Sequence, residues 1–260
     1  MRLGCFGKFN QFELIEKNGF DCAELDFGEL AAMTDAQLSE VKRQIRNSVV
    51  SVEVFSGLLP LNLRLYDGTF DETYWLKYID NGASKACELG CRMIPFGAGK
   101  CRSIPTVACK SICRKKLVSF VKNICAVLNN YHIDLVIEPL GPHYSNYINT
   151  IEEANEFAED VNAGNCKIMC DYRHMISADD PLDNIIKYKD KIQHAHIDYP
   201  FGIKRKFPQP EDGVDYSAYL RKLNQAGYKG ILTVEAIDFE NFDAESAKSC
   251  LYLKKMVQNE

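Results

Sequence analysis

Short apolar runs alternate with amphipathic segments along the 260-residue chain, and this alternation constrains the fold more than any other feature. Eight runs have the length and composition of buried strands, at residues 2–6, 22–26, 49–55, 92–96, 135–138, 167–171, 193–196 and 231–235. Eight segments with helical periodicity follow them, at residues 9–18, 35–46, 71–89, 107–129, 151–161, 181–189, 216–226 and 244–257. Strands and helices that alternate in this way form a parallel sheet.

The sheet is predicted to close into a barrel and not to stay open. The strand count is eight, and a barrel of eight βα units needs about 250 residues. The residues with the chemistry of a site follow strands five, six, seven and eight, and an open doubly wound sheet could not bring all of them to one point. No linker or low-complexity segment divides the chain. We therefore predict an α/β protein that is a single (β/α)8 TIM barrel over residues 1–260.

Four of the predicted strands end on a residue that can bind a divalent metal ion: Glu138, Asp171, His196 and Glu235. A parallel barrel collects the carboxyl ends of its strands on one face, where these four can share one ion. Each also has a structural interpretation as an ion-pair partner, or as a helix N-cap for Asp171, but four such ends together favour the metal. Three carboxylates and one imidazole suit Mn²⁺, Mg²⁺ or Co²⁺, and they also accept Zn²⁺. His194 faces the same side as His196 and is expected to be a barrel-interior histidine.

The composition indicates which kinds of molecule the protein is not expected to bind. A net charge of −5 disfavours nucleic acid, whose phosphates require clustered positive charge. No run reaches the roughly 18 apolar residues of a membrane helix, so no membrane partner is expected. The eleven cysteines include no CxxC pair and are predicted to be reduced thiols of a cytoplasmic protein. An exposed helix face could pair copies of the chain into a homo-oligomer.

Three stretches of the sequence resemble the sugar phosphate isomerase/epimerase superfamily, the xylose isomerase-like barrels, and the resemblance covers nearly the whole chain. The segment IEPLGPHYSNYINTIEEANEFAEDVNAGNCKIMCDYRHM at 137–175 is similar to the superfamily's E-P-L, N-x-x-N-T and D-x-x-H-M pattern. FGAGKCRSIP at 96–105 resembles its loop after strand four, and GVDYSAYLRKLNQAGYKGILTVEA at 213–236 resembles its closing segment. The superfamily includes ketose 3-epimerases, inosose dehydratases, inosose isomerases and endonuclease IV.

The resemblance makes the same four strand-end residues the metal ligands and gives substrate contacts to His174, Arg205 and Arg102. Arg205 lies further downstream than the pattern expects, and Arg102 could equally pin its own loop in place. Endonuclease IV needs extra histidines from strands two and three for its three zinc ions. This chain has no histidine before His132, so DNA repair is not expected.

The two glutamates of the predicted metal set indicate the chemistry. A metal polarises a ketose carbonyl and stabilises the enediolate, while Glu138 and Glu235 act as the catalytic groups that move a proton on opposite faces of the adjacent carbon. The expected protein is an isomerase, a divalent-metal-dependent epimerase or isomerase that acts on a sugar or sugar phosphate. Two alternatives stay open: a metal-dependent dehydratase of the inosose or dehydroshikimate type, and a non-catalytic sugar-binding barrel.

Overall fold

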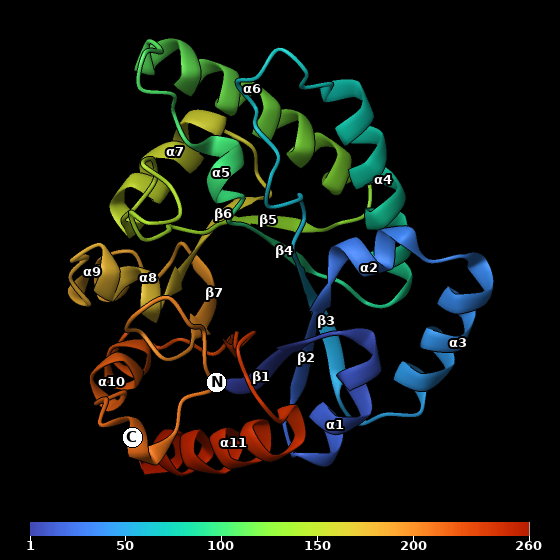
Figure 1. The fold of residues 1–260 in the computed structure, drawn as a ribbon, viewed down its shortest axis with the longest axis vertical. Coiled ribbons are helices and arrows are strands. Elements are labelled where there is room, and N and C mark those ends of the chain that lie inside the picture. The colour runs from blue at the N-terminus through green and yellow to red at the C-terminus, as the bar shows by residue number, and fades with distance from the viewer. Residues whose placement is uncertain (260) are drawn as a thin grey trace.

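The structure, a computed structural model, describes residues 1–259. Its eight strands form one closed parallel barrel in sequence order, in which the last strand pairs with the first (Figure 1). The strands are β1 (Arg2–Gly7), β2 (Cys22–Asp26), β3 (Ser51–Ser56), β4 (Met93–Phe96), β5 (Asp134–Ile137), β6 (Cys166–Asp171), β7 (Ile192–Ile197) and β8 (Ile231–Val234). The predicted TIM barrel is confirmed.

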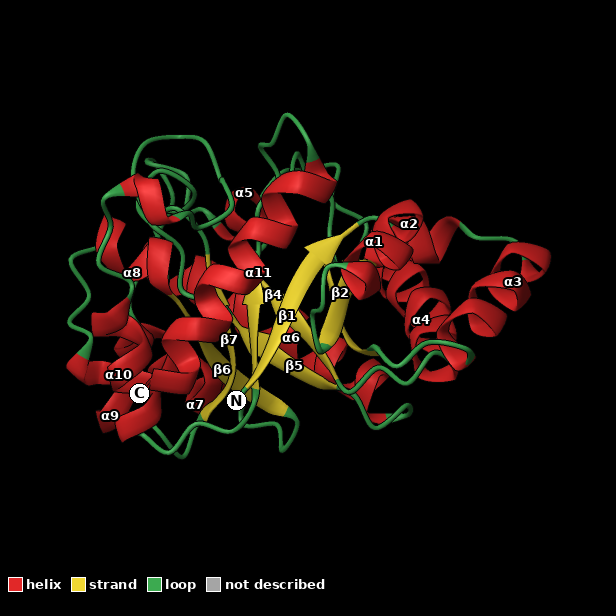
Figure 2. Ribbon diagram, turned by 90° about the horizontal axis from the view of Figure 1, so that it is seen from below, coloured by secondary structure: helices red, strands yellow, loops and turns green. Residues whose placement is uncertain are grey.

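Helices surround the strands on the outside of the barrel (Figure 2). Eight of them match predicted segments: α1 (Phe12–Lys17), α3 (Asp35–Arg46), α4 (Glu72–Glu88), α6 (Lys110–Asn129), α7 (Ile151–Val161), α9 (Asp183–Lys187), α10 (Ser217–Gln225) and α11 (Phe242–Asn259). The structure also has two 3-10 turns, η1 (Phe9–Gln11) and η2 (Pro210–Asp212). Thr150 caps α7 by accepting a hydrogen bond from the amide of Glu153, as its position before the first acidic turn predicts.

Three short helices were not predicted, and each begins within three residues of the end of a strand, at the carboxyl end of the barrel. They are α2 (Phe27–Ala32), α5 (Gly99–Arg102) and α8 (Tyr172–Ser177), which follow β2, β4 and β6. Segments of four to six residues are too short to display helical periodicity in a sequence. These helices matter because they place side chains beside the mouth of the barrel.

A glycine allows the first and last strands to pack closely where the barrel closes. Gly4 of β1 pairs with Thr233 of β8. A Cβ atom at Gly4 would lie 2.8 Å from Cγ2 of Ile231 and 2.9 Å from Oγ1 of Thr233. The missing side chain therefore leaves room for those of β8 inside the barrel.

Two predicted strands end one residue earlier than expected. Strand β5 stops at Ile137 and β8 at Val234, so Glu138 and Glu235 are the first residues beyond the regular strands. Their amides still bond back to the sheet, from Glu138 to the carbonyl of Phe96 at 3.3 Å and from Glu235 to that of Ile197 at 3.1 Å. Both carboxylates are thus held by sheet-like backbone at the rim.

All eleven cysteines are free, and nine of them are buried, as expected for structural thiols. None of the described helices combines the length with the apolar character that crossing a membrane requires. The cytoplasmic location remains a prediction.

Candidate metal centre

The four strand-end residues converge at the carboxyl end of the barrel. Glu138, Asp171, His196 and Glu235 each offer one ligand atom, and these atoms all lie within 4.8 Å of one another. From Nδ1 of His196, a carboxylate oxygen of Glu235 lies at 2.9 Å, one of Asp171 at 3.7 Å and one of Glu138 at 3.8 Å. Three of the four side chains are buried, and Glu235 is partly exposed at the mouth. Residues from β5 to β8 therefore form one compact cluster.

The donor set fits a divalent cation. Oε1 of Glu138 and Nδ1 of His196 are buried and form no hydrogen bond. Buried charged and polar groups without partners are costly unless a cation or a hydrogen bond satisfies them. Three carboxylates with one imidazole match the preference of Mn²⁺, Mg²⁺ or Co²⁺ for oxygen-rich sites, and Zn²⁺ accepts the same ligands.

Electrostatics inside the cluster agree with this fit. Burial alone would raise the pKa of Glu138, but contacts with His174 and His196 outweigh it and hold that pKa at about 2. Burial likewise opposes ionisation of Asp171, yet His174, His196 and Arg205 lower its pKa. Burial disfavours a charged His196, but Glu24 and Glu235 raise its pKa well above the usual value. A metal ion would replace the proton that His196 carries among these carboxylates.

Asp171 serves the helix and the cluster at once. Its Oδ1 accepts a hydrogen bond from the amide of His174 at 3.1 Å and so caps α8. Its Oδ2 lies 3.7 Å from Nδ1 of His196. The N-cap and the ligand are thus compatible roles for one carboxylate, because each uses a different oxygen.

His174 points into the cavity above the cluster. It is 1% exposed, and neither ring nitrogen has a hydrogen-bond partner. Its Nε2 lies 3.5 Å from Oε1 of Glu138 and 3.8 Å from Oδ2 of Asp171. The short helix α8 therefore brings the histidine to a place where it can reach a bound molecule.

Arg205 also reaches the cluster, although it comes from the long loop after β7. Its Nη2 donates to Oε2 of Glu235 and lies 3.4 Å from Oδ2 of Asp171. Its Nε donates to Asp198 at 2.9 Å. Burial raises the pKa of Asp198 to about 7 despite this arginine. The guanidinium thus supplies positive charge beside two of the candidate ligands.

Arg102 does not reach the cavity. Its position therefore does not support the substrate contact that the resemblance suggested for it. The side chain is fully buried. Its three nitrogens donate to the backbone carbonyls of Tyr147 at 3.1 Å, Phe96 at 3.2 Å and Ile148 at 2.9 Å. Ile148 has a φ of 62°, which is costly for a β-branched residue. Arg102 therefore holds this strained loop against the end of β4. This is the structural role that was the alternative to a substrate contact.

Sequence reasoning missed Glu24, a carboxylate inside the buried run of β2. It is 1% exposed, and its oxygens lie 2.9 Å from Nε2 of His194 and 3.1 Å from Nε2 of His196. Ser56 donates its hydroxyl to the same carboxylate. An acidic residue between Ala23 and Leu25 was the available signal, since an unpaired carboxylate is rarely buried. His194 is fully buried, as expected for a barrel-interior histidine.

A cavity of about 400 Å³ opens above the cluster. Glu138, His174, Arg205 and Glu235 form part of its lining. Gly97, at the end of β4, belongs to the same lining, and a Cβ atom there would collide with Oε2 of Glu138. The outer wall is apolar, with Leu58, Leu59, Leu61, Ile203 and Ile237. Polar groups that converge below apolar walls are typical of small-molecule sites.

The model of the xylose isomerase-like TIM barrel family matches residues 12–256 of the sequence. The chain belongs to this family. No curated protein sequence matches it.

Solved structures with the same fold cover nearly the whole chain. D-psicose 3-epimerase from Clostridium cellulolyticum H10, solved with D-tagatose, has a TM-score of 0.84 and 18% identity and covers 99% of each chain. The 3-keto-D-glucoside 4-epimerase YcjR from E. coli has a TM-score of 0.81 and 21% identity and covers 98% of this chain and 99% of its own. The IOLI protein, solved with a bound zinc atom, has a TM-score of 0.76 and 18% identity and covers 100% and 97%.

Proposed function

We propose that this protein is a divalent-metal-dependent epimerase or isomerase of a keto sugar or its phosphate. The observation that carries the proposal is the pair of glutamates, Glu138 and Glu235, within one cation-binding cluster at the floor of a cavity. A divalent ion bound there would polarise a substrate carbonyl, acidify the neighbouring C–H and stabilise the negative charge that develops.

The two glutamates supply the proton transfer in this proposal. Glu138 follows β5 and Glu235 follows β8, so their carboxylates approach the cavity from different strands of the ring. With its pKa at about 2, Glu138 is ionised at neutral pH and can accept a proton. One carboxylate removes a proton from one face of the carbon beside the carbonyl and then releases it to water, while the other takes a proton from water and delivers it to the opposite face. This exchange inverts the carbon, whereas return to the adjacent carbon would isomerise the sugar.

Neighbouring residues support the same reaction. His174 has two unpartnered ring nitrogens in the cavity, so it can donate a hydrogen bond to a substrate oxygen. Arg205 donates to Glu235 and thereby orients that carboxylate.

The substrate class is supported by the structural neighbours. Their names describe epimerases of D-psicose and of a 3-keto-D-glucoside, which are all ketone-bearing carbohydrates. The IOLI protein, which has the same fold, was solved with a bound zinc atom, and this supports a divalent ion as the cofactor. We therefore propose a small-molecule carbohydrate as the partner and Mn²⁺, Mg²⁺, Co²⁺ or Zn²⁺ as the ion.

Solvent deuterium exchange tests this function. The protein, supplied in turn with each of the four ions, is incubated in D₂O with D-psicose, D-fructose, D-tagatose, a 3-keto-glucoside and a keto-inositol. Mass spectrometry reads deuterium uptake, and chromatography reads new sugars. The proposal expects one deuterium beside the carbonyl together with an epimer or isomer.

The other outcomes contradict it in different ways. Loss of water with an ultraviolet-absorbing enone would make the protein a dehydratase. Saturable sugar binding without any exchange would make it a sugar-binding barrel. A protein that binds no divalent ion would overturn the metal centre itself.

A further inference from the structure

Glu24 is a buried carboxylate that the proposed reaction does not use. It lies on β2, across the barrel from β6, and its carboxylate is enclosed by the interior side chains of β3 and β7. A buried carboxylate is destabilising unless hydrogen bonds or opposite charge compensate it. Here three side chains from two strands contact its oxygens, so the group has a definite orientation.

The contacts divide between the two oxygens of Glu24. Oε1 accepts from the hydroxyl of Ser56 and lies 3.1 Å from Nε2 of His196. Oε2 lies 2.9 Å from Nε2 of His194 and 3.3 Å from Nε2 of His196. Both histidines thus present the same nitrogen to one carboxylate, and the remaining nitrogen of His196 points at Glu138, Asp171 and Glu235.

We propose that Glu24 is the positioning residue of the metal centre, because it fixes His196 as a ligand through Nδ1. An imidazole that gives its Nε2–H to a carboxylate keeps its lone pair on Nδ1, and the negative partner makes that nitrogen a stronger donor. The backbone of β7 alone would leave the imidazole of His196 free to rotate about its side-chain bonds. The hydrogen bond to Glu24 therefore also fixes the plane of this ring. This inference rests on the metal centre of the proposed function.

His194 has a different part in this arrangement. Its contact with Oε2 and that of Ser56 with Oε1 hold the two oxygens of Glu24 from opposite sides. The carboxylate therefore cannot swing away from His196 without losing a buried hydrogen bond. Glu24, His194 and His196 also lie close enough to hold a cation of their own. That arrangement would require His196 to bind one ion through each nitrogen, so the number of ions per chain separates the two interpretations.

Metal titration of the whole chain tests the proposal without any substrate. Affinity and stoichiometry for Mn²⁺ and Zn²⁺ are measured by calorimetry on the wild type, Glu24→Gln and the control Glu53→Gln. Glu53 lies on the neighbouring strand β3, where it pairs with Arg2 away from the cluster. Loss of a hydrogen-bonded partner behind a metal-binding histidine weakens metal binding about 10–100-fold, so Glu24→Gln should fall in this range and Glu53→Gln should match the wild type.

A second readout separates positioning from mere structural support. Nitrogen-15 NMR of histidine-labelled, zinc-loaded protein should assign the metal to Nδ1 of His196 and the proton to Nε2. In Glu24→Gln the amide can donate as well as accept, so a fraction of the chains should carry the His196 proton on Nδ1 and hold no zinc at that nitrogen. Glu24→Asp keeps the charge but shortens the reach and should restore the tautomer more than the affinity.

The outcomes are distinguishable. Wild-type protein that binds no ion overturns the proposed function, whereas equal affinity in wild type and Glu24→Gln overturns only the role of Glu24. Two ions per chain would assign Glu24 to a second cation site and contradict the positioning role. If Glu24→Gln does not fold, His194→Gln decides, with an expected loss of affinity smaller than the about 10–100-fold expected for a direct partner of the ligand; an unchanged affinity and an unchanged tautomer there reject the proposal.

Discussion

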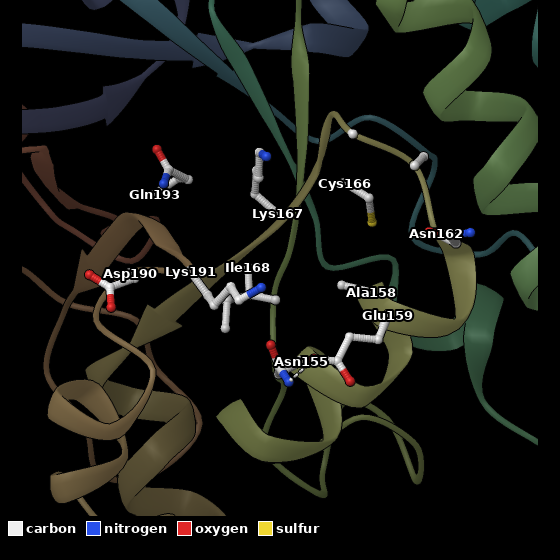
Figure 3. A pocket seen from close by; sticks show the side chains of 12 residues that line it. Asn155, Ala158, Glu159, Asn162, Cys166, Lys167, Ile168, Asp190, Lys191 and Gln193 are labelled. Atoms are coloured by element: carbon white, nitrogen blue, oxygen red, sulfur yellow. Dashed lines mark hydrogen bonds between the residues drawn. The ribbon is translucent and has the colours of Figure 1, made fainter.

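Two cavities of similar volume lie at opposite ends of the barrel strands, and the candidate chemistry belongs to the one at the carboxyl ends. The cavity at the amino ends of β6 and β7 is lined by residues such as Glu159, Asp190 and Lys191 (Figure 3). Its volume is about 490 Å³, and that of the cavity at the carboxyl ends is about 400 Å³. Its polar lining includes Glu159, Asp190, Lys191 and Gln193, and all four side chains are exposed. Those groups have water as a partner, whereas the carboxylates of the other cavity are buried against one another. Convergence of buried charge, and not volume, marks the functional end.

The chain itself explains why the two ends differ. Segments that enter the strands are short, such as the four residues between α1 and β2. Several segments that leave the strands are longer, such as those between β3 and α4 and between β7 and α10. Parallel strands also present their last residues together at one end. The carboxyl end therefore has both the converging side chains and the loop length needed to build a site.

Exchange of a glutamate for glutamine should have the largest effect, and only at the carboxyl end. Glu138→Gln and Glu235→Gln each remove a proton-transfer group, so turnover should fall by about 10²–10⁴-fold. Glu159→Gln at the amino-end cavity makes the same chemical change on an exposed side chain and should leave turnover within about twofold. The measurement is the rate of deuterium exchange into a turned-over sugar. Equal losses in all three variants would remove the distinction between the two ends.

Metal loading should stabilise the protein through the carboxyl end alone. An ion at 100 times its dissociation constant stabilises the folded state by about 2.7 kcal/mol, which corresponds to a rise in Tm of roughly 5–10 °C for a domain of this size. EDTA should reverse the rise. Asp171→Asn should lose most of it, and Asp190→Asn should keep it. Calorimetric melting with and without Mn²⁺ checks this, and an equal rise in the two variants would place the ion elsewhere.

The sequence was sufficient for the barrel and for the residues that converge, but not for their surroundings. Glu138, Asp171, His196 and Glu235 could be found because each follows an apolar run, and strand order alone brings such ends together. Glu24 could not be assigned a partner, since its contacts with His194 and His196 join residues 170 and 172 positions apart. Glu24 was missed, whereas Arg102 was given a role that it does not have. An arginine near the mouth suggests substrate binding, and only the surrounding carbonyls show that it is structural.

Arg102 should matter for stability and not for substrate affinity. In Arg102→Met the buried carbonyls of Tyr147, Phe96 and Ile148 each lose the hydrogen bond from the guanidinium, although each keeps a second donor. A hydrogen bond to a charged group contributes about 1.5–3 kcal/mol, so the loss of three, partly compensated by the remaining donors, should lower the free energy of unfolding by about 3 kcal/mol. Lys100→Met on the same short helix, at an exposed position, should change it by less than about 0.5 kcal/mol. Urea unfolding measures both. If Arg102→Met instead raised KM and left stability unchanged, Arg102 would be a substrate-binding residue.

The smallest effect is expected for charge changes in the amino-end cavity. Asp190→Asn and Lys191→Gln alter exposed side chains that line it. Because water compensates these charges in the folded and unfolded chains alike, each variant should stay within about 0.5 kcal/mol of the wild-type stability, with metal affinity and turnover unchanged. Stability is read by urea unfolding and metal affinity by calorimetry. A clear loss of turnover in either variant would show that the amino end takes part in the reaction, and burial of charge would then no longer be a sufficient guide to which end of a barrel is active.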